Sequence, residues 1–534
     1  MKLQYILIVC CSLLSCSRHT QPIQPGNGVV PHERKISWKT QSDFADKNFS
    51  AWANKSISID KLNGKGVSPR ILLAKLLLKK DIPNVNYLIT KLRVWGVSGS
   101  SWAFNKKGDY DFTLTPLTTL LFLLGDQPSI LYPATKEYLL TTLLSESGNQ
   151  FRYKAPKTWG TFDETENHIL MTEGSRYLKN RWIMLHGNST ALYNNIDNGM
   201  EAKLLSFLEG INSGGLYEFN SIPYSGYTIT ALLNLEAFAS EKVKLAARNV
   251  LDYMNWTYAL GCYQFKHYPP MRRRYEKASI TSITTDYHSV FLKAWLSYLP
   301  LSHFSGNEQI GDPHALMASC LPYRPADKVV DLIFNKGDGY FVKIGHGKNS
   351  CPEIYAAGKK YLLSSGGANR GKFSEIIARP ICLFLPDSAE DLSQVIHLSG
   401  PGTNFMGWNN TGVYKNFACA AGPVYVPESF KPLLKTAIWT IYSLSDSLLV
   451  AVHSKVSFGL VAIFNRIDTD RLLSTLIECN PDSNLLNTRF QFPGGQLLHY
   501  DVLAPNNQWV IISANNIIVN RDFDQWPLIE SSFE

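Results

Sequence analysis

The sequence predicts a multidomain protein with an α-helical N-terminal part followed by a β-rich C-terminal part. Between residues 35 and 300, apolar residues recur at three- and four-residue spacing, which is the periodicity of amphipathic helices. Beyond residue 322 the apolar segments become shorter and richer in β-branched and aromatic residues, and turn-forming residues separate them. Helices that precede strands, rather than alternate with them, indicate two domains in one chain.

The helical segments have similar lengths, and Gly, Asn, Ser or Pro stands at most of their ends. Because no strands are expected between them, they suit an array of helical hairpins, which can close on itself as an (α/α) toroid. The predicted helices cover residues 84–96, 114–126, 134–145, 166–182, 200–211, 227–239, 241–260 and 286–300.

The later segments predict an antiparallel β-sandwich. A stretch with the Gly and Pro content of a connector, residues 303–327, lies between the two parts. We therefore expect a toroid catalytic domain at 35–310 and a β-sandwich domain at 311–534. The predicted strand regions are 339–345, 359–367, 379–386, 437–454, 458–465 and 508–520.

The N-terminus predicts export. Residues 1–15 carry one Lys and a short apolar run, which is typical of a signal peptide. The ending "LLSC" resembles a bacterial lipobox and predicts lipidation of Cys16, so that residues 16–34 form a polar tether. We expect a membrane-anchored lipoprotein on the periplasmic or cell-surface face; a simply secreted protein is the alternative.

Net charge and cysteine usage limit the kinds of partner and metal site that we expect. The net charge is +8, which favours acidic partners. Nucleic acid is a poor candidate because no RNA- or DNA-binding motif is present, whereas an anionic polysaccharide or a membrane surface fits an exported protein. Six cysteines remain after residue 16 without any CxxC pair, so structural zinc is not expected and a disulfide stays open. The sequence does not predict the oligomeric state.

Two polar clusters stand where predicted helices begin. In "DETENHILMTEGSRYLKNRW", Thr161 and Glu164 have the spacing of a capping box, which predicts a helix start near residue 162. Asn167 and His168 follow, either as a satisfied helix end or at the border of a cleft. In "GGLYEFNSIPYSGYTITALLNL", the loop before the next helix carries Glu218, Asn220, Ser221, Tyr224 and Tyr227.

Polar groups of this kind cost about 1–3 kcal/mol each when buried without partners, so the loop either lines a wet cleft or is braced by hydrogen bonds. Asp109 and Asp111 precede another helix, where capping is expected and substrate contact is the alternative. For Trp102 and Trp159 two positions are open, in a groove that binds sugars or in the hydrophobic core. We expect Glu353, Lys359 and the segment 411–423 to brace the interface between the domains, and His288 to be structural.

The helical part, with these two motifs, resembles the toroid of polysaccharide lyases of the alginate lyase and heparinase II/III type. In those families an Asn-His pair opens a helix, and a Gly-Gly-x-x-x-Glu loop leads to a Tyr at the head of the next helix. This sequence has Asn167-His168, then Glu218 in "GGLYEF", then Tyr227. The match covers the domain order and these two motifs. Ser221 departs from the Arg that the family's loop carries, and the replacement cation is sought in Lys266, Arg272, Arg273 and Arg274.

The resemblance implies β-elimination on a uronic-acid glycan without a redox or organic cofactor; no metal ligand set is expected, although a structural cation stays open. Asn167 and a cation would hold the substrate carboxylate and stabilise the charge that develops in the transition state. His168 and Tyr227 are the candidate base and acid, with Tyr224 as the other candidate phenol. We expect His168 and Tyr227 to face each other across a sugar-sized opening.

Two other functions remain open at this stage. A toroid glycoside hydrolase would use two carboxylates flanking the scissile bond, drawn from Asp111, Glu166 and Glu218. A glycan-binding lipoprotein would use the same cleft without chemistry. For the lyase, the expected substrate-binding residues are Glu218, Asn220, Tyr224, Arg272, Arg273, Trp102 and Trp159.

Overall fold

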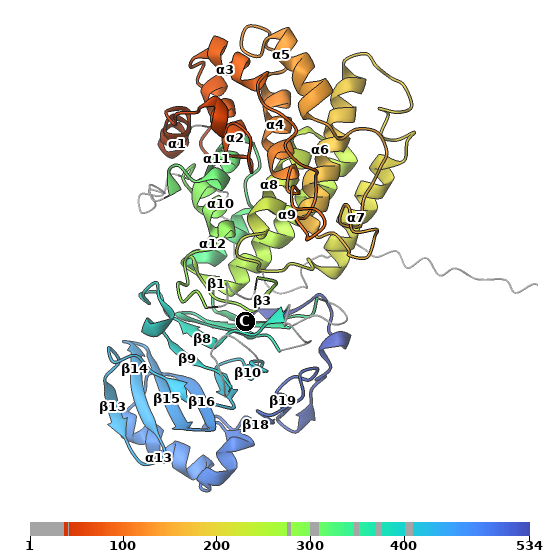
Figure 1. Ribbon diagram of the computed structural model, residues 1–534. Helices are drawn as coiled ribbons and strands as arrows, with labels where there is room; N and C mark the ends of the chain where they lie inside the picture. The colour runs from red at the N-terminus through yellow and green to blue at the C-terminus, as the bar shows by residue number, and fades with distance from the viewer. Residues whose placement is uncertain are drawn as a thin grey trace, which may run out of the picture.

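The computed structural model describes residues 37–40, 42–274, 279–299, 309–346, 352–368, 376–400 and 409–533. The predicted signal peptide, Cys16 and the tether lie outside these residues. Figure 1 shows the two parts of the chain, with helices in red to green and the C-terminal sheets in teal to blue below them. The predicted order, helices followed by antiparallel sheets, is confirmed.

Every predicted helical segment contains a helix. Segment 134–145 differs in detail, because a single π-helical turn over Leu139–Leu143 follows its α-helix. The helices are α1 (Asp43–Ala53), α2 (Val67–Leu77), α3 (Ile82–Ile89), α4 (Asp111–Leu124), α5 (Pro133–Tyr138), α6 (Glu166–Leu185), α7 (Met200–Gly214), α8 (Ser225–Phe238), α9 (Glu241–Gly261), α10 (Tyr287–Leu296), α11 (Pro313–Cys320) and α12 (Asp327–Phe334). The last two of them follow residue 310, so helices continue to Phe334.

Contacts between the inner helices form a closed circuit. Helix α2 packs on α4, α4 on α6, α6 on α8, α8 on α10 and α11, and α11 packs back on α2. Helices α1 and α9 pack outside this circuit, on α2 and α8. A hydrogen bond between polar side chains links two of these helices: Asn234 of α8 accepts from the Thr119 hydroxyl of α4 at 2.7 Å and donates to the Thr115 carbonyl at 3.0 Å.

Three antiparallel sheets build most of the C-terminal part. The seven-stranded sheet has the order β12-β9-β8-β6-β5-β4-β21, the six-stranded sheet β10-β11-β16-β15-β14-β13, and the four-stranded sheet β17-β18-β19-β20. The strands of the first are β4 (Gly339–Ile344), β5 (Glu353–Gly358), β6 (Tyr361–Gly366), β8 (Ile381–Phe384), β9 (Ile396–Leu398), β12 (Val424–Tyr425) and β21 (Ile529–Phe533).

The other two sheets are joined by α13 (Thr469–Cys479). Their strands are β10 (Val413–Tyr414), β11 (Phe417–Ala420), β13 (Pro432–Lys435), β14 (Thr440–Ser445), β15 (Leu448–Lys455) and β16 (Phe458–Asn465), then β17 (Arg489–Gln491), β18 (Leu497–Tyr500), β19 (Ile511–Ala514) and β20 (Ile517–Ile518). Short strands also lie between α9 and α10, where none is predicted: β1 (Cys262–Tyr263), β2 (Lys266–His267) and β3 (Met271–Arg272).

The seven-stranded sheet is buried on both faces. Successive side chains of a strand point to opposite faces, and in β5 Tyr355 and Ala357 belong to the core of the helices, whereas Ile354 and Ala356 belong to the core shared with the six-stranded sheet. Burial on both sides explains why strands such as β8, "ICLF", read as continuous apolar runs.

The helical part and the seven-stranded sheet therefore share one hydrophobic core. Strand β3 also crosses the junction, because it pairs with β7 (Ile376–Ile377) of the C-terminal part. The end of α9 lies so close to the sheet that a Cβ added at Gly261 would stand 2.6 Å from the Tyr355 ring. These contacts position the loops between α7 and α8, and between β3 and α10, against the sheet.

Cysteine and hydropathy patterns add two findings. The cysteines that the structure describes, Cys262, Cys320, Cys382, Cys419 and Cys479, are free thiols, so no disulfide forms among them. In the same ranges, the helices lack the combination of length and apolar character that crossing a bilayer requires.

Candidate functional site

Helix α6 begins at Glu166, with Thr165 at the N-cap position. The prediction of a start near residue 162 from a capping box is wrong. The carboxylate of Glu164 is used elsewhere: it accepts hydrogen bonds from the backbone N–H of Ser100 at 2.9 Å and from the Ser100 hydroxyl. Local spacing assigns the Glu164 side chain to the helix cap, but the side chain bonds to the distant Ser100 instead. Because α6 begins at Glu166, Asn167 and His168 lie in its first turn.

His168 forms a buried pair with Asp111. Its Nδ1 lies 2.6 Å from Oδ2 of Asp111, and both side chains are at most 4 % exposed. Burial lowers the pKa of His168, but the charge and hydrogen bond of Asp111 outweigh burial and raise that pKa to about 9. At neutral pH the imidazole is therefore protonated, and Nδ1–H donates to Asp111.

Asp111 is the first residue of α4, and the N-cap of this helix is Tyr110 without a side-chain cap bond. The capping expected of Asp109 and Asp111 is therefore wrong. Asp109 instead forms an ion pair with Lys65, and Asp111 accepts a hydrogen bond from the backbone N–H of Gly99 at 3.3 Å besides holding His168.

Glu218 connects Asn167 to Arg273. The amide Nδ2–H of Asn167 donates to Oε2 of Glu218 at 2.5 Å, and Nη1 of Arg273 lies 2.6 Å from Oε1. Asn167 is fully buried, whereas the Arg273 side chain is 30 % exposed. Burial raises the pKa of Glu218, and the neighbouring guanidinium of Arg273 opposes that rise. The structure thus brings together three residues that the sequence predicts for the site.

A second carboxylate lies beside Glu218. Burial, followed by the charge of Glu218, raises the pKa of Glu166 to about 7. Its Oε1 accepts a hydrogen bond from the backbone N–H of Tyr217. Its Oε2 is buried and has no hydrogen-bond partner among the residues the structure describes. Glu166 is therefore able to carry a proton at neutral pH.

The two candidate phenols have different surroundings, and both are half-buried. The Tyr227 ring packs edge-on against Phe112 at 4.4 Å and against His314 at 5.1 Å between ring centroids, and burial raises its pKa to about 12. The Tyr224 hydroxyl accepts a hydrogen bond from Nη1 of Arg274 at 3.2 Å, and its ring lies 4.9 Å from the Arg273 guanidinium.

Phe112 also packs edge-on against His168, at 5.6 Å between ring centroids. Both catalytic candidates of the sequence therefore contact the same ring. The cavity that His168 lines measures only about 10 Å³ among the described residues, which is at the lower limit for one water molecule. This cavity is too small for a sugar ring, and Tyr227 is not among its lining residues.

The three consecutive arginines have separate roles. The guanidinium of Arg272 lies 4.3 Å from the centroid of the Tyr217 ring, whereas Arg273 and Arg274 reach Glu218 and Tyr224. Arg273 and Arg274 have φ of 66° and 62°, and Asn220 has φ of 51°. Non-glycine residues in this region are strained by about 1–3 kcal/mol each, and such strain gathers at functional sites. Lys266 does not contact these residues; its Nζ donates to the Pro386 carbonyl at 2.7 Å.

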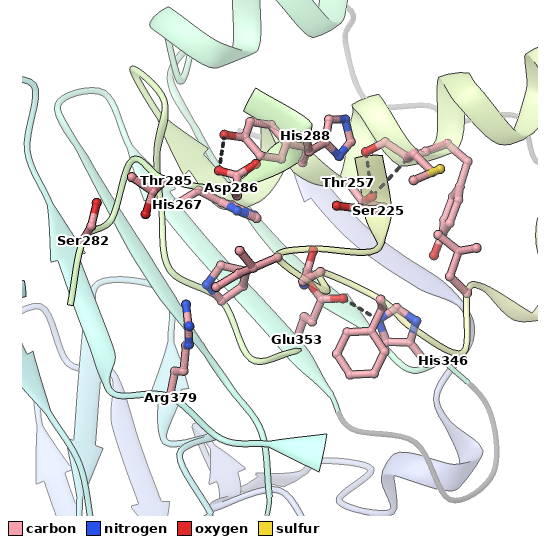
Figure 2. A pocket seen from close by; sticks show the side chains of 18 residues that line it. Ser225, Thr257, His267, Ser282, Thr285, Asp286, His288, His346, Glu353 and Arg379 are labelled. Carbon is pink, nitrogen blue, oxygen red and sulfur yellow. Dashed lines mark hydrogen bonds and ion pairs between the residues drawn. The ribbon is translucent and has the colours of Figure 1, made fainter. Parts of the chain in front are cut away.

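The loop that carries Glu218 is fastened to the seven-stranded sheet through Asn220. Its amide donates to Oε2 of Glu353 on β5 at 2.7 Å and to the Pro270 carbonyl at 3.1 Å. Glu353 also receives hydrogen bonds from His346 and from the Tyr355 hydroxyl. Figure 2 shows Glu353 and His346 side by side under this loop. The bracing role expected of Glu353 is confirmed, and Asn220 is its partner.

The cavity drawn in Figure 2 lies at this junction and measures about 40 Å³, which is room for water rather than for a sugar ring. Its lining includes buried histidines. Nε2–H of His288 donates a hydrogen bond to Oδ1 of Asn255 at 2.9 Å, and burial lowers the pKa of His288 to about 3. The structural role expected of His288 is confirmed.

The two candidate tryptophans belong to an aromatic ledge formed by Trp102, Phe104, Trp159 and Phe162. Trp102 stacks on Phe162 with centroids 4.8 Å apart, and Trp159, 96 % exposed, stacks on Phe104 at 6.3 Å. The ledge is joined to the turn of His168 by the Ser100–Glu164 hydrogen bonds. Phe104, Trp159 and Phe162 are exposed, so the ledge lies on the surface and is not part of the core.

Sequence reasoning did not identify Phe112 or Arg70 as members of the site. Arg70 is buried in α2, and Nη1 donates to the Gly66 carbonyl at 2.8 Å; its charge opposes the rise in the pKa of Tyr227. The available signal was an arginine directly before the apolar run "ILLAKLL" of α2. Among the residues that the structure places, no three His, Cys, Asp or Glu side chains are arranged to hold a metal ion. No family model and no curated protein matches the sequence.

Proposed function

We propose that the protein is a polysaccharide lyase that cleaves a uronic-acid-containing anionic glycan by β-elimination. The observation that carries this proposal is the arrangement of Asn167, Glu218 and Arg273 beside the His168–Asp111 pair and two phenols. The closed circuit of α2, α4, α6, α8 and α11 supports an (α/α) toroid, and the core shared by the six- and seven-stranded sheets supports a β-sandwich.

Arg273 is the group that takes the substrate carboxylate, because its side chain is partly exposed and Glu218 fixes only one edge of its guanidinium. A planar guanidinium presents further N–H donors to a second carboxylate. Asn167 acts through Glu218, since its amide is fully buried. The imidazolium of His168 supplies positive charge where the C5 carbanion develops, which lowers the energy of the transition state.

The phenols divide the proton transfers between them. Tyr224 acts as the base in its phenolate form, facing the guanidinium groups of Arg273 and Arg274; it takes the proton from C5, becomes a neutral phenol and later returns this proton to solvent. The electron pair of the C5–H bond forms the C4=C5 double bond, and the C4–O4 bond breaks. Tyr227 protonates the departing O4, because burial raises its pKa to about 12 and keeps its hydroxyl protonated.

Substrate reaches His168 when the wall formed by residues 98–99 and 152–156 moves away from α6, since these segments line the small cavity at His168. The aromatic ledge directly follows these two segments in the chain and receives the sugar rings on the way in. The net charge of +8 favours encounter with a polyanion. Lipidation at Cys16 and export belong to the same proposal, because a polymer substrate is met outside the cell.

The experiment is a screen of alginate, hyaluronan and polygalacturonate for products that absorb near-ultraviolet light, which only an unsaturated uronate supplies. In the active substrate, Tyr224→Phe and Tyr227→Phe each lower kcat about 10²–10⁴-fold, the range for loss of a general acid or base, and leave KM nearly unchanged. Tyr217→Phe, on the neighbouring loop position, is the matched control. Full activity in both phenol variants would falsify the assignment.

A glycoside hydrolase is the second candidate, and the protonated state of Glu166 beside Glu218 favours it. The same screen separates the two functions, because a hydrolase releases reducing ends without the ultraviolet absorbance. Glu166→Gln then abolishes hydrolysis, whereas in the lyase it leaves elimination largely intact. A protein that binds these polymers and releases neither product is a binding protein only.

A further inference from the structure

A cleft of about 700 Å³ opens in the C-terminal part, and it shares no lining residue with the candidate site. Both large sheets contribute to it. The seven-stranded sheet supplies the turn between β5 and β6, and the six-stranded sheet supplies the turn between β10 and β11 and the end of β16. The volume lies within the roughly 300–1,000 Å³ range of small-molecule sites.

Lysines dominate the charge of this cleft. Lys359 and Lys360 form the turn between β5 and β6, and Lys415 stands in the turn between β10 and β11; all three are exposed. Asp338 is the acidic residue among the described lining residues. The cleft therefore has a net positive charge and attracts anions.

The turn at Lys415 is built at a conformational cost. The pairs Val413–Ala418 and Tyr414–Phe417 leave two residues for this turn, and Lys415 has φ of 50°. Glycine, asparagine and aspartate are the residues that two-residue hairpins favour at positive φ. A lysine at this positive φ lowers the stability of the turn, and strained backbone positions of this kind concentrate at binding sites.

Apolar rings and amides complete the lining. Phe341, Tyr361 and Phe464 are half-buried along the cleft, and the amides of Asn465 and Gln496 stand at its rim. Aromatic faces pack on the C–H faces of sugar rings, amides bond to hydroxyl groups, and lysines pair with carboxylates. The combination differs from a lipid or peptide groove, in which apolar side chains prevail.

We propose that this cleft binds a second segment of an anionic glycan, a uronate oligosaccharide, away from the site of chemistry. The choice of a uronate rests on the proposed function, whereas the existence of an anionic-saccharide site rests on the cleft alone. A second contact on the same chain raises the effective concentration of the polymer at the candidate site.

The test compares two triple variants that remove equal charge. Lys359→Gln/Lys360→Gln/Lys415→Gln changes the cleft, and Lys431→Gln/Lys435→Gln/Lys455→Gln changes exposed lysines elsewhere on the six-stranded sheet. Both are made with Arg273→Gln, so that binding at the candidate site does not mask the cleft. Calorimetry with alginate and hyaluronan hexasaccharides is the readout, with maltohexaose as the neutral probe.

We expect the cleft variant to bind at least one uronate hexasaccharide about 10-fold more weakly than the control variant, which is the combined effect of three exposed ion pairs. Equal affinities of the two variants for both uronate probes overturn the proposal. Binding of anionic phosphatidylglycerol vesicles in place of the saccharides, lost in the cleft variant alone, also overturns it, because the cleft is then a lipid site. Failure of the elimination screen leaves these measurements unaffected, so the two proposals fail separately.

Discussion

The Asp111–His168 pair shows how much of the candidate site depends on contacts between distant residues. Both residues stand out in the sequence, one before a predicted helix and one in the Asn-His motif, yet 57 positions separate them. Local spacing assigns Asp111 to capping, because cap preference is the only local role that a carboxylate at a helix start reveals. The charge state of His168 follows from the pairing and was not predictable from either motif.

Replacing Asp111 by Asn is expected to lower the pKa of His168 from about 9, because Asp111 is the main carboxylate that opposes burial and only the weaker effects of Glu164 and Asp109 remain. The imidazole proton signals of His168 in NMR titrations of the wild type and the variant measure this shift. His288, whose pKa burial lowers to about 3, is the internal control and stays unchanged. A His168 signal that still titrates near 9 in the variant contradicts the assigned pairing.

The same pair makes stability depend on pH in a defined direction. The folded-state pKa of His168 lies above its unfolded value of 6.5, so the pair's contribution is fully present below 6.5 and is lost as the pH rises through about 9. We expect the free energy of unfolding of the wild type to fall across this window, measured by urea denaturation. In Asp111→Asn the fall is absent; a parallel fall in both proteins would assign it to other groups.

At the scale of elements, the sequence predicts helices and strands well and their junctions poorly. Segments such as 166–182 and 458–465 carry strong local periodicity and fold as predicted into α6 and β16. The start of α6 was placed too early, because Glu164 bonds to Ser100 from a distant segment. Strands β1 to β3 are not predicted, because each has only two residues, too few for a recognisable hydrophobic alternation, and forms through its pairing with another strand.

The loop between α7 and α8 takes its shape from Glu353 on β5, so its position is sensitive to the sheet. Glu353→Gln is expected to lower the free energy of unfolding by about 1–3 kcal/mol, because a buried carboxylate that accepts from Asn220, His346 and Tyr355 is replaced by a group with one acceptor oxygen. We also expect turnover to fall, because Glu218 is displaced with the loop. Thermal denaturation and the elimination assay measure the two effects.

Glu530→Gln is the matched control for that substitution. Glu530 lies on β21 of the same sheet and pairs with Lys343 at 2.9 Å, but its side chain is 53 % exposed. Exposed ion pairs contribute about 0–1 kcal/mol, so this variant keeps both stability and turnover. If both variants lose the same stability and turnover, the position of the loop between α7 and α8 depends on the sheet edge and not on the hydrogen bonds of Glu353.

At the scale of the whole molecule, the helices and the sheets are not independent units. Tyr340, Tyr355 and Phe384 of the seven-stranded sheet belong to the core that the helices form, and the Tyr340 hydroxyl donates to the Leu260 carbonyl at 2.6 Å. The sequence indicates two domains because local periodicity changes along the chain. It does not reveal that one sheet is buried on both faces, since continuous apolar strands are equally compatible with other packings.

A chain that ends after Phe334 is therefore expected to fail to fold, because the helices lose the apolar surface of the seven-stranded sheet. The measurement is circular dichroism and thermal unfolding of residues 37–334, beside the full chain. The full chain should unfold the helices and the seven-stranded sheet in a single transition. A fragment that melts cooperatively at the temperature of the full chain contradicts a shared core.

The pairing of β3 with β7 also determines how the protein would respond to a cut backbone. If a protease recognition sequence were inserted between Gly337 and Asp338, cleavage would produce two polypeptides still held by this ladder and by the common apolar interior. They would elute together in native gel filtration and separate only in denaturant. Two pieces expressed from separate genes would then reassemble into one working particle.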